Sequence, residues 1–324
     1  MASDNRRNNT GQRLSTDQIS AAAAAAEIIG GNEDLVAEIL QRLPPKSLIR
    51  FKSVSKTWLF LISSDRFSLL HWQHQHPQFH DPKISGLFFT SRSGSGFIEF
   101  IPLIFSATIN GGEENKSLAL LTADMNTDKI VEDSCNGFLL ICCTSRKIKY
   151  HVYNPTTKQF STIPWTFFRV FTFPGDRVYL VFEPSKSLHY KFVLLQSKLY
   201  GGAYLCQMRI YSSETKAWSS PPNICDQHPF QVPRCVDLAN GVYCNGSIHW
   251  ISFSPLETSI YFDVDQQRFC PMPSPPCRID VFKFWHFGKS WGHLHCINYH
   301  DATGLNVDVY EMESDYSKWT LKYR

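Results

Sequence analysis

The sequence has no strong excess of either charge, and this absence limits the functions open to it. Its 324 residues carry a formal net charge of +3, and no run of lysine and arginine marks a basic surface. Nucleic-acid binding usually requires such a surface, so we expect none. No apolar run approaches the ~20 residues that span a bilayer, and no signal peptide is visible before or around the short alanine run Ala21–Ala26. We therefore expect a protein of the cytoplasm, the nucleus or both, with no membrane partner.

The sequence also lacks the cysteine spacing of a disulfide framework. Its ten cysteines are scattered irregularly, and in a reducing compartment we expect them to remain thiols. Zinc sites usually contain closely spaced ligand pairs. Two groups of residues are candidate ligands: His71, His74, His76 and His80, and Cys270, Cys277, His293, His295 and Cys296. The first group has metal-like spacing, but glutamine and proline lie between its members and no cysteine accompanies it. In the second group six residues separate Cys270 from Cys277, so we predict no metal at either group.

Motifs that would indicate an enzyme are missing as well. The sequence contains no phosphate-binding P-loop, no dinucleotide fingerprint, no HExxH zinc motif and no GxSxG nucleophile motif. Its carboxylates are scattered through the larger half of the chain and suggest no acid–base pair. We therefore expect no catalytic residue and no cofactor.

What the sequence does contain is a group of three short amphipathic helices within residues 32–67. The first has apolar residues at steps of three and four, which share one face: Leu35, Val36, Ile39, Leu40 and Leu43. Asn32 is a suitable N-cap, Pro44 ends this helix, and Pro45 fits the first turn of the next. The third helix covers residues 56–63. Because so small a unit buries little apolar surface alone, we expect it to complete its core against another chain.

A series of short matches, in order, identifies a family for this segment. They are Glu33-Asp34-Leu35, Glu38-Ile39-Leu40, Leu43-Pro44, Lys46-Ser47-Leu48 and Val54-Ser55-Lys56-Thr57-Trp58. Together they resemble the F-box, especially its plant form. Two positions depart from that pattern: Gly31-Asn32 stands where Leu-Pro usually opens the motif, and Ser55 replaces a common cysteine.

The resemblance implies a function as the substrate-recognition subunit of a ubiquitin ligase. F-box domains bind a SKP-type adaptor, which connects them to a cullin and a RING subunit, so these are the implied partners, together with a protein substrate of unknown identity. The residues that the resemblance assigns to the adaptor contact are Leu35, Ile39, Leu40, Leu43, Pro44, Leu48, Val54 and Trp58. Because interfaces concentrate their energy in a few anchors, Leu40 and Trp58 are the preferred ones. We assign no substrate-binding residue.

The larger half of the sequence has a period of two and an internal repeat. In each unit an aromatic residue is followed seven positions later by a second aromatic and four positions after that by proline: Tyr153, Phe160 and Pro164; Tyr211, Trp218 and Pro222; Phe262, Phe269 and Pro273. A fourth unit is expected at Tyr310, with Trp319 nine positions later. A period of about 50 residues is typical of kelch-like propeller blades. The repeat also resembles the F-box-associated C-terminal domain of plant proteins.

The sequence therefore predicts an α+β multidomain protein: a three-helix F-box followed by an all-β, propeller-like repeat domain. We expect a disordered tail at residues 1–30, the F-box at 31–70, a linker at 71–86 and the β domain at 87–324. Four or five blades would fit, in a chain shorter than a full family member or with an unusual ring closure. Three alternatives stay open: a β-sandwich, a carbohydrate-binding or enzymatic propeller with an accessory helical domain, and an F-box scaffold that acts outside a ligase.

Overall fold

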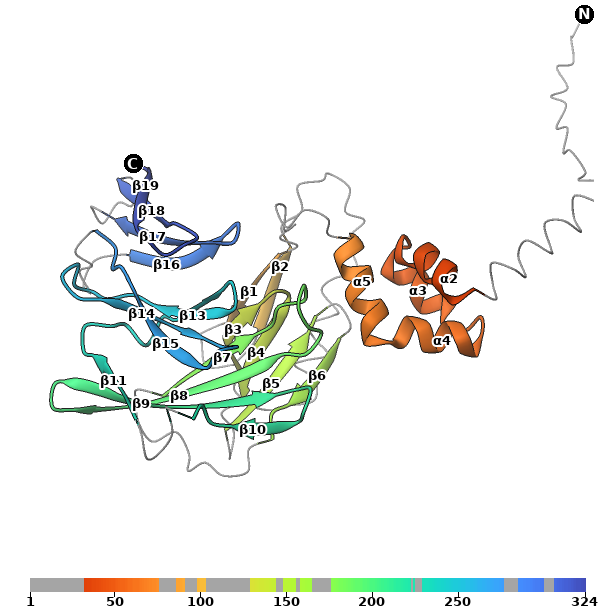
Figure 1. The fold of residues 1–324 in the computed structure, drawn as a ribbon, viewed down its shortest axis with the longest axis horizontal. Helices are drawn as coiled ribbons and strands as arrows, with labels where there is room; N and C mark the ends of the chain where they lie inside the picture. Colours follow the sequence, from red (N-terminus) through yellow and green to blue (C-terminus); the bar gives the residue numbers. More distant parts are fainter. Residues whose placement is uncertain are drawn as a thin grey trace, which may run out of the picture. The chain divides into compact units, whose positions relative to one another are not determined.

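The chain forms two compact units that divide between Pro77 and Gln78. The computed structural model describes residues 32–75, 86–90, 98–102, 129–143, 148–155, 158–164, 176–222, 224, 229–276, 285–299 and 306–324. The first unit is helical and the second consists of antiparallel sheets (Figure 1). The expected tail at residues 1–30 lies outside the described residues.

The helical unit begins where the sequence predicts it. Asn32 caps α2, because its side-chain oxygen accepts hydrogen bonds from the backbone N–H groups of Asp34 and Leu35. Pro45 is the first residue of α3, and the Ser55 hydroxyl accepts a hydrogen bond from the Trp58 backbone at the start of α4. The helices are α2 (Glu33–Gln41), α3 (Pro45–Phe51), α4 (Lys56–Ser63) and α5 (Asp65–Gln75).

The helical unit contains a fourth helix, α5, in addition to the three that the sequence predicts. Residues 71–75, expected to begin a linker, form its last turns. The His71 ring stacks on Phe67, and its Nε2 lies 2.8 Å from the carbonyl oxygen of Leu43, so α5 closes over the end of α2. The histidines and glutamines of residues 71–75 hid this role, because they give the segment no clear apolar period.

The second unit contains four sheets of four or five strands and one two-stranded sheet in the described residues. The two-stranded sheet is β1 (Gly86–Thr90) and β2 (Ile98–Pro102). Blade 1 consists of β3 (Lys129–Cys135), β4 (Phe138–Cys143), β5 (Lys149–Asn154) and β6 (Gln159–Thr162). Blade 2 consists of β7 (Arg177–Val181), β8 (Lys191–Tyr200), β9 (Ala203–Ser212), β10 (Ala217–Ser219) and β11 (Phe230–Pro233).

The remaining two blades have four strands each. Blade 3 consists of β12 (Val242–Cys244), β13 (Ser247–Trp250), β14 (Ser259–Asp263) and β15 (Arg268–Met272). Blade 4 consists of β16 (Trp285–Ser290), β17 (His293–Tyr299), β18 (Val307–Met312) and β19 (Trp319–Tyr323). Within blades 1, 3 and 4 the strands pair in sequence order. The first strands of successive blades are in contact: β3 with β7, β7 with β12, and β12 with β16. This arrangement confirms the predicted propeller-like β domain.

Packing between blades accounts for where the core lies. Strands β4 and β13, and the segment Phe192–Leu195 of β8, are buried on successive residues rather than on alternate ones, because neighbouring sheets cover both of their faces. One cluster of buried residues extends across blades 1 to 3, and a second joins blades 3 and 4. At the centre of the first, the Trp250 indole donates to the Tyr179 hydroxyl, which in turn donates to the carbonyl oxygen of Leu238.

The repeat in the sequence corresponds to a repeated joint between blades. The two aromatics of each unit face each other across the outer hairpin: Tyr153 opposite Phe160, Tyr211 opposite Trp218, and Phe262 opposite Phe269. The repeat prolines supply acceptors: the Trp218 indole donates to the Pro164 carbonyl at 2.8 Å, and the Trp319 indole donates to the Pro273 carbonyl at 2.9 Å. Each of these bonds ties an outer strand to the preceding blade.

The assignment of Tyr310 as the first aromatic of the fourth unit is wrong. Met312, not Tyr310, lies opposite Trp319, while Tyr310 faces Leu321 across a register shift. The spacing of seven is therefore kept in blade 4, but methionine replaces the first aromatic.

Candidate functional site

The helical unit exposes many of the apolar side chains that its sequence supplies. Its buried core consists of Val36, Leu40, Leu48, Ile62 and Phe67. Outside that core, six large apolar side chains on or beside α2, α3 and α4 are exposed, and we call them the exposed apolar face: Leu35, Ile39, Ile49, Val54, Leu59 and Phe60. The exposed fraction reaches 69% for Ile49 and 80% for Phe60.

The predicted adaptor-contact residues divide into three groups. Leu35, Ile39, Pro44 and Val54 are exposed, as a docking role requires. Leu43 and Trp58 are partly buried against the helical core. The Trp58 and Phe51 rings meet edge-on, with their centroids 5.6 Å apart. Leu40 and Leu48 are buried, with Leu40 only 1% exposed. The preference for Leu40 as an anchor therefore needs correction: it holds the helices together, and a partner cannot reach it without opening the unit.

Sequence reasoning missed Ile49, Leu59 and Phe60. Helix α4 is apolar at five consecutive positions, Trp58 to Ile62, so its spacing could not show which side faces inward. In α2 the apolar stripe is also too wide to show which of its residues face inward. Val36 and Leu40 point into the core, while the adjacent pair Leu35 and Ile39, also four residues apart, stays exposed.

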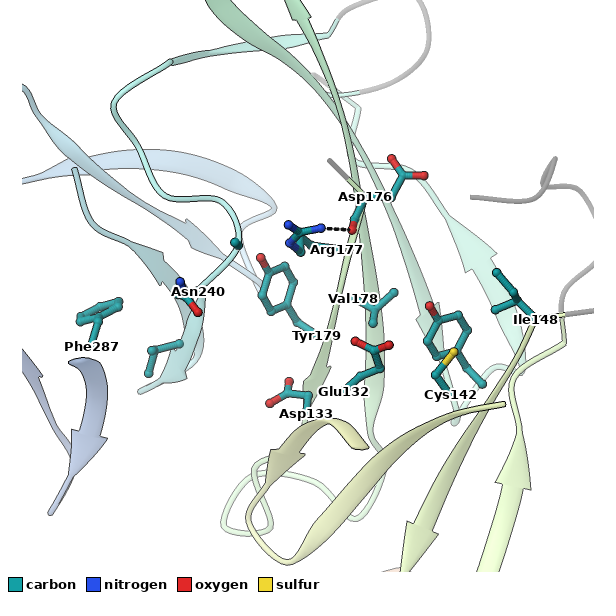
Figure 2. Close-up of a pocket in the computed structure, with 14 residues that line it drawn as sticks. Glu132, Asp133, Cys142, Ile148, Asp176, Arg177, Val178, Tyr179, Asn240 and Phe287 are labelled. Atoms are coloured by element: carbon teal, nitrogen blue, oxygen red, sulfur yellow. Dashed lines mark hydrogen bonds between the residues drawn. The ribbon is translucent and has the colours of Figure 1, made fainter. Parts of the chain in front are cut away.

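In the β domain, the inner strands frame a cavity near their starting ends. It has a volume of about 600 Å³ and is lined by residues of all four blades. Figure 2 shows Glu132 and Asp133 from β3, Arg177 and Tyr179 from β7, Asn240 before β12, and Phe287 from β16. We call it the acidic cavity, because three carboxyl groups, including Asp176, line it against the single arginine Arg177.

Burial dominates the electrostatics of the acidic cavity. It raises the pKa of the Asp133 carboxyl to about 6, although the backbone N–H groups of Leu180 and Ser134 donate to its oxygens. Burial also raises the pKa of Glu132 and of Asp176, and the nearby Arg177 charge opposes both shifts. The Arg177 guanidinium itself donates to the backbone carbonyl of Asp176, the dashed line in Figure 2. All three carboxyls thus have a raised proton affinity in a concave site.

A second cavity lies where the inner strands end and turn. It has a volume of about 670 Å³, and we call it the turn cavity. Its lining includes Asn136, Asn245 and Trp291 from three inner hairpin turns, together with Lys289 of β16 and Lys186 after β7. Glu183 also lines it, and its carboxylate accepts a hydrogen bond from Ser185.

Two Cys-Asn-Gly turns beside the turn cavity connect successive blades. The Asn136 side chain donates to the Phe182 carbonyl of blade 2 at 2.7 Å, and the Asn245 side chain donates to the Gly292 carbonyl of blade 4 at 2.8 Å. The preceding thiols, Cys135 and Cys244, point at the same two carbonyls. Burial raises the pKa of both thiols. These cysteines are therefore structural and poorly reactive.

The candidate metal ligands do not come together. No group of three or more histidine, cysteine and carboxylate side chains that could hold a metal is found among the described residues, and Cys277, His76 and His80 lie outside them. His295 instead pairs with Glu311, its Nε2 lying 3.1 Å from the carboxylate. The eight cysteines of the described part are all free thiols.

None of the described helices is both long enough and apolar enough to cross a bilayer.

Comparison with known proteins agrees with both units. The family described as the F-box domain matches residues 32–70, and the family described as the F-box associated beta propeller domain matches residues 105–301. An F-box protein of Arabidopsis thaliana is 31% identical over 322 residues, which cover 93% of this chain and 71% of the relative. Another F-box protein of that plant is 29% identical and covers 76% of this chain and 63% of its own length.

A third relative from the same plant, described as F-box only protein 8, is 24% identical and covers 75% of this chain and 79% of its own length. The chain thus spans between 63% and 79% of these three relatives. The matches confirm the resemblance carried by the motifs between Asn32 and Trp58 and by the aromatic repeat. The chain therefore belongs to the F-box proteins that carry an F-box associated β-propeller domain.

Proposed function

We propose that this chain is the substrate-receptor subunit of a SKP–cullin–F-box ubiquitin ligase. The helical unit docks on a SKP-type adaptor, and the propeller domain holds a protein substrate. The observation that carries the proposal is the exposed apolar face, which lies within the segment that the F-box family matches. The six side chains come from one short segment of the chain, and soluble proteins rarely expose large apolar patches unless a partner covers them.

The structure supports a revised set of adaptor contacts. We place Leu35, Ile39, Pro44 and Val54 in the contact, as expected from the family resemblance, and add Ile49, Leu59 and Phe60 because they are exposed. Leu40, Leu43, Leu48 and Trp58 act mainly from within, by fixing the positions of the helices that carry these side chains. Phe60 is the preferred anchor, since large exposed aromatics contribute most to such interfaces.

This role needs no catalytic group in the chain. In such an assembly, the receptor raises the effective concentration of substrate lysines near the ubiquitin-carrying enzyme, and this proximity supplies the rate increase. The cullin and RING subunits are reached through the adaptor. We further propose that the protein acts in the cytoplasm, the nucleus or both, which fluorescence microscopy of a tagged full-length chain would test.

The test is a pull-down of the full chain with a purified SKP-type adaptor. We expect Ile39→Asp and Phe60→Asp to weaken adaptor binding at least about tenfold, because each places a charge in an apolar interface. Leu256→Asp is the matched control: its side chain is 94% exposed, on the propeller domain, and its change should leave adaptor recovery intact. Equal recovery of all three variants would refute the proposed contact. Leu40→Asp is unsuitable, because it would unfold the helical unit.

The acidic cavity favours a second candidate function, that of a carbohydrate-binding or hydrolytic propeller. Glu132 and Asp176 line a concave site and have raised pKa values, as a general acid would. A glycan array probed with the wild type and Glu132→Gln distinguishes the two functions. Saccharide binding that Glu132→Gln abolishes supports the second candidate, while adaptor binding with no glycan signal supports the first. Recovery of cullin with the adaptor separates a ligase subunit from a scaffold.

A further inference from the structure

The inner hairpin turns of blades 1, 3 and 4 share one backbone conformation but not one sequence. Their central pairs are Asn136-Gly137, Asn245-Gly246 and Trp291-Gly292, and φ is positive at all six positions. Asparagine tolerates this left-handed conformation well and is the usual residue before glycine in such a turn. A tryptophan there is strained, because its β-carbon crowds the backbone. Blade 4 therefore departs from the turn chemistry that blades 1 and 3 use.

The departure removes a stabilising contact as well as adding strain. Asn136 and Asn245 use their side chains to bond the next blade, at 2.7 and 2.8 Å. None of the described residues accepts a hydrogen bond from the Trp291 indole, and the residue is 57% exposed on the turn cavity. A strained, exposed aromatic that contributes little to the fold is typical of a functional position.

The charges around Trp291 indicate what would bind there. Lys289, two residues earlier, is exposed and forms no ion pair with any of the described residues; its ammonium lies 5.4 Å from the centre of the Tyr243 ring. Lys186 is only loosely paired, 3.8 Å from an Asp265 carboxylate that also binds Lys191 at 3.1 Å. Glu183 is the only carboxylate among the described residues that line the cavity, so the cavity favours a negatively charged ligand.

We propose that the turn cavity binds an acidic peptide segment of the protein substrate, with an apolar side chain against Trp291 and carboxylates near Lys289 and Lys186. The inference rests on the proposed function and adds to it the chemical class of the substrate segment and the end of the propeller that receives it. Tryptophan and a neighbouring cation form the type of anchor that dominates protein interfaces.

The test uses two variants that give blade 4 the residues of blade 1. Trp291→Asn introduces the residue that blade 1 has at the equivalent turn position, Asn136, and Lys289→Ser introduces the equivalent of Ser134. The fold should therefore persist in both variants. The probes are short fluorescent peptides with a central Phe between Glu residues, with the Glu residues replaced by Lys, or with the Phe replaced by Ala. Fluorescence anisotropy with the purified full chain measures affinity.

We expect the Glu-flanked Phe peptide to bind at least about tenfold tighter than either altered peptide. Trp291→Asn should weaken its binding at least about tenfold, and Lys289→Ser should weaken it and reduce its dependence on salt. Leu256→Asn, which removes an exposed apolar side chain elsewhere on the β domain, should change nothing. Equal binding of Glu- and Lys-flanked peptides, no binding of the Glu-flanked peptides by the wild type, or full binding by Trp291→Asn would overturn the proposal.

Adaptor pull-downs on the same preparations separate this inference from the proposed function. If the wild type recovers the adaptor but does not prefer the acidic peptide, the substrate class is wrong and the ligase role stands. If the wild type fails to recover the adaptor, the ligase role fails whatever the peptides show.

Discussion

The helical unit and the propeller domain treat their apolar side chains in opposite ways. The propeller places its large aromatics between blades, where Trp250 and Phe262 are fully buried, and ties adjacent blades with repeated hydrogen bonds. The helical unit has five buried apolar side chains in its core, while six large ones on or beside α2, α3 and α4 are exposed. From this difference we expect the propeller to be stable by itself, and we expect the proposed adaptor to cover the exposed apolar face of the helical unit.

The largest effect we expect is in the propeller core. Trp250→Ala removes a fully buried ring together with its hydrogen bond to Tyr179, and should lower the free energy of unfolding by about 3–5 kcal/mol. Denaturant titration measures this loss. Because we expect the two units to fold independently, the Trp250→Ala variant should still bind the adaptor at low temperature. Loss of adaptor binding without any loss of stability would show that the two units are not independent.

A pH-dependent effect follows from the joint between blades 3 and 4. The His249 ring packs beside the rings of Tyr261 and Tyr316, which stack on each other. Its Nδ1 lies 3.1 Å from the Val242 carbonyl oxygen, and its Nε2 lies 2.7 Å from the Tyr316 hydroxyl oxygen. A carbonyl can only accept, so Nδ1 carries the proton and Nε2 accepts from Tyr316. Burial lowers the pKa of His249 from 6.5 to about 4, which keeps the ring neutral in the fold.

Because the pKa of His249 is lower in the folded state than in the unfolded state, folding stability decreases in acid. Above pH 6.5 the histidine is neutral in both states. Between pH 6.5 and about 4 the unfolded chain binds the proton first, so folding stability falls as the pH falls. The loss is on the order of 2–3 kcal/mol at pH 4. His249→Gln cannot titrate, so unfolding curves at several pH values should show a smaller acid loss than the wild type. An unchanged pH profile would contradict this account of the joint.

Asp133 titrates in the same pH range as His249, so the effect of His249 is measured as the difference between the wild type and His249→Gln. Burial raises the pKa of its carboxyl from 3.8 to about 6, so its contribution favours the fold as the pH falls from 6 to 3.8. This opposes the histidine effect in the wild type. Because both proteins share Asp133, the difference between their pH profiles isolates His249.

The asparagine contacts between blades should contribute less than either of these. Asn245→Ala removes the bond to the Gly292 carbonyl and places alanine at positive φ, which together should cost about 1–2 kcal/mol of unfolding free energy. Asn136→Ala should cost a similar amount through the Phe182 carbonyl. Thermal denaturation of both variants checks the pair. A negligible loss in both would mean that these turns do not hold the blades together.

The two tryptophan–proline contacts should be weaker still. Trp218→Phe and Trp319→Phe keep an aromatic ring but remove the N–H that bonds the Pro164 or Pro273 carbonyl. Each should lower stability by about 1 kcal/mol. Chemical denaturation at fixed pH provides the measurement. An increase in stability would show that these bonds are not part of what makes the propeller self-sufficient.

The smallest expected effect is on the helical unit. Phe60→Asp should change the stability of the free chain by less than about 0.5 kcal/mol, because the side chain is 80% exposed. Ile62→Asp, two residues away and buried, should unfold the helices and serves as the contrast. Circular dichroism separates the two results. A large loss from Phe60→Asp would place Phe60 inside the protein's own core and remove the basis for a docking surface.

Much of this architecture could be predicted from the sequence because local chemistry determines it. The Asn32 cap, the Pro45 start of α3 and the bounds of α4 follow from residue types that act within one helical turn. The hairpin of β12 and β13 follows from the Asn245-Gly246 pair, whose positive φ angles the turn requires. The aromatic spacing of seven is the distance along the chain between cross-strand partners around an outer turn.

The remaining features depend on tertiary packing, which short patterns do not encode. The α2 stripe shows that Val36 and Ile39 are both apolar, but only the packed helices show that Val36 is covered and Ile39 is not. The strain at Trp291 becomes visible only when the turns of three blades are compared in space. The acidic cavity joins residues that are far apart in the sequence, such as Glu132 and Asn240.

Hydrogen exchange of the full chain, with and without the SKP-type adaptor, tests the docking surface most directly. Amides that a partner covers exchange more slowly. We expect the adaptor to slow exchange within residues 33–63, which contain α2, α3 and α4, and to leave exchange in the long strands β8 and β9 of the propeller unchanged. Protection in the propeller strands with none in these helices would contradict this expectation.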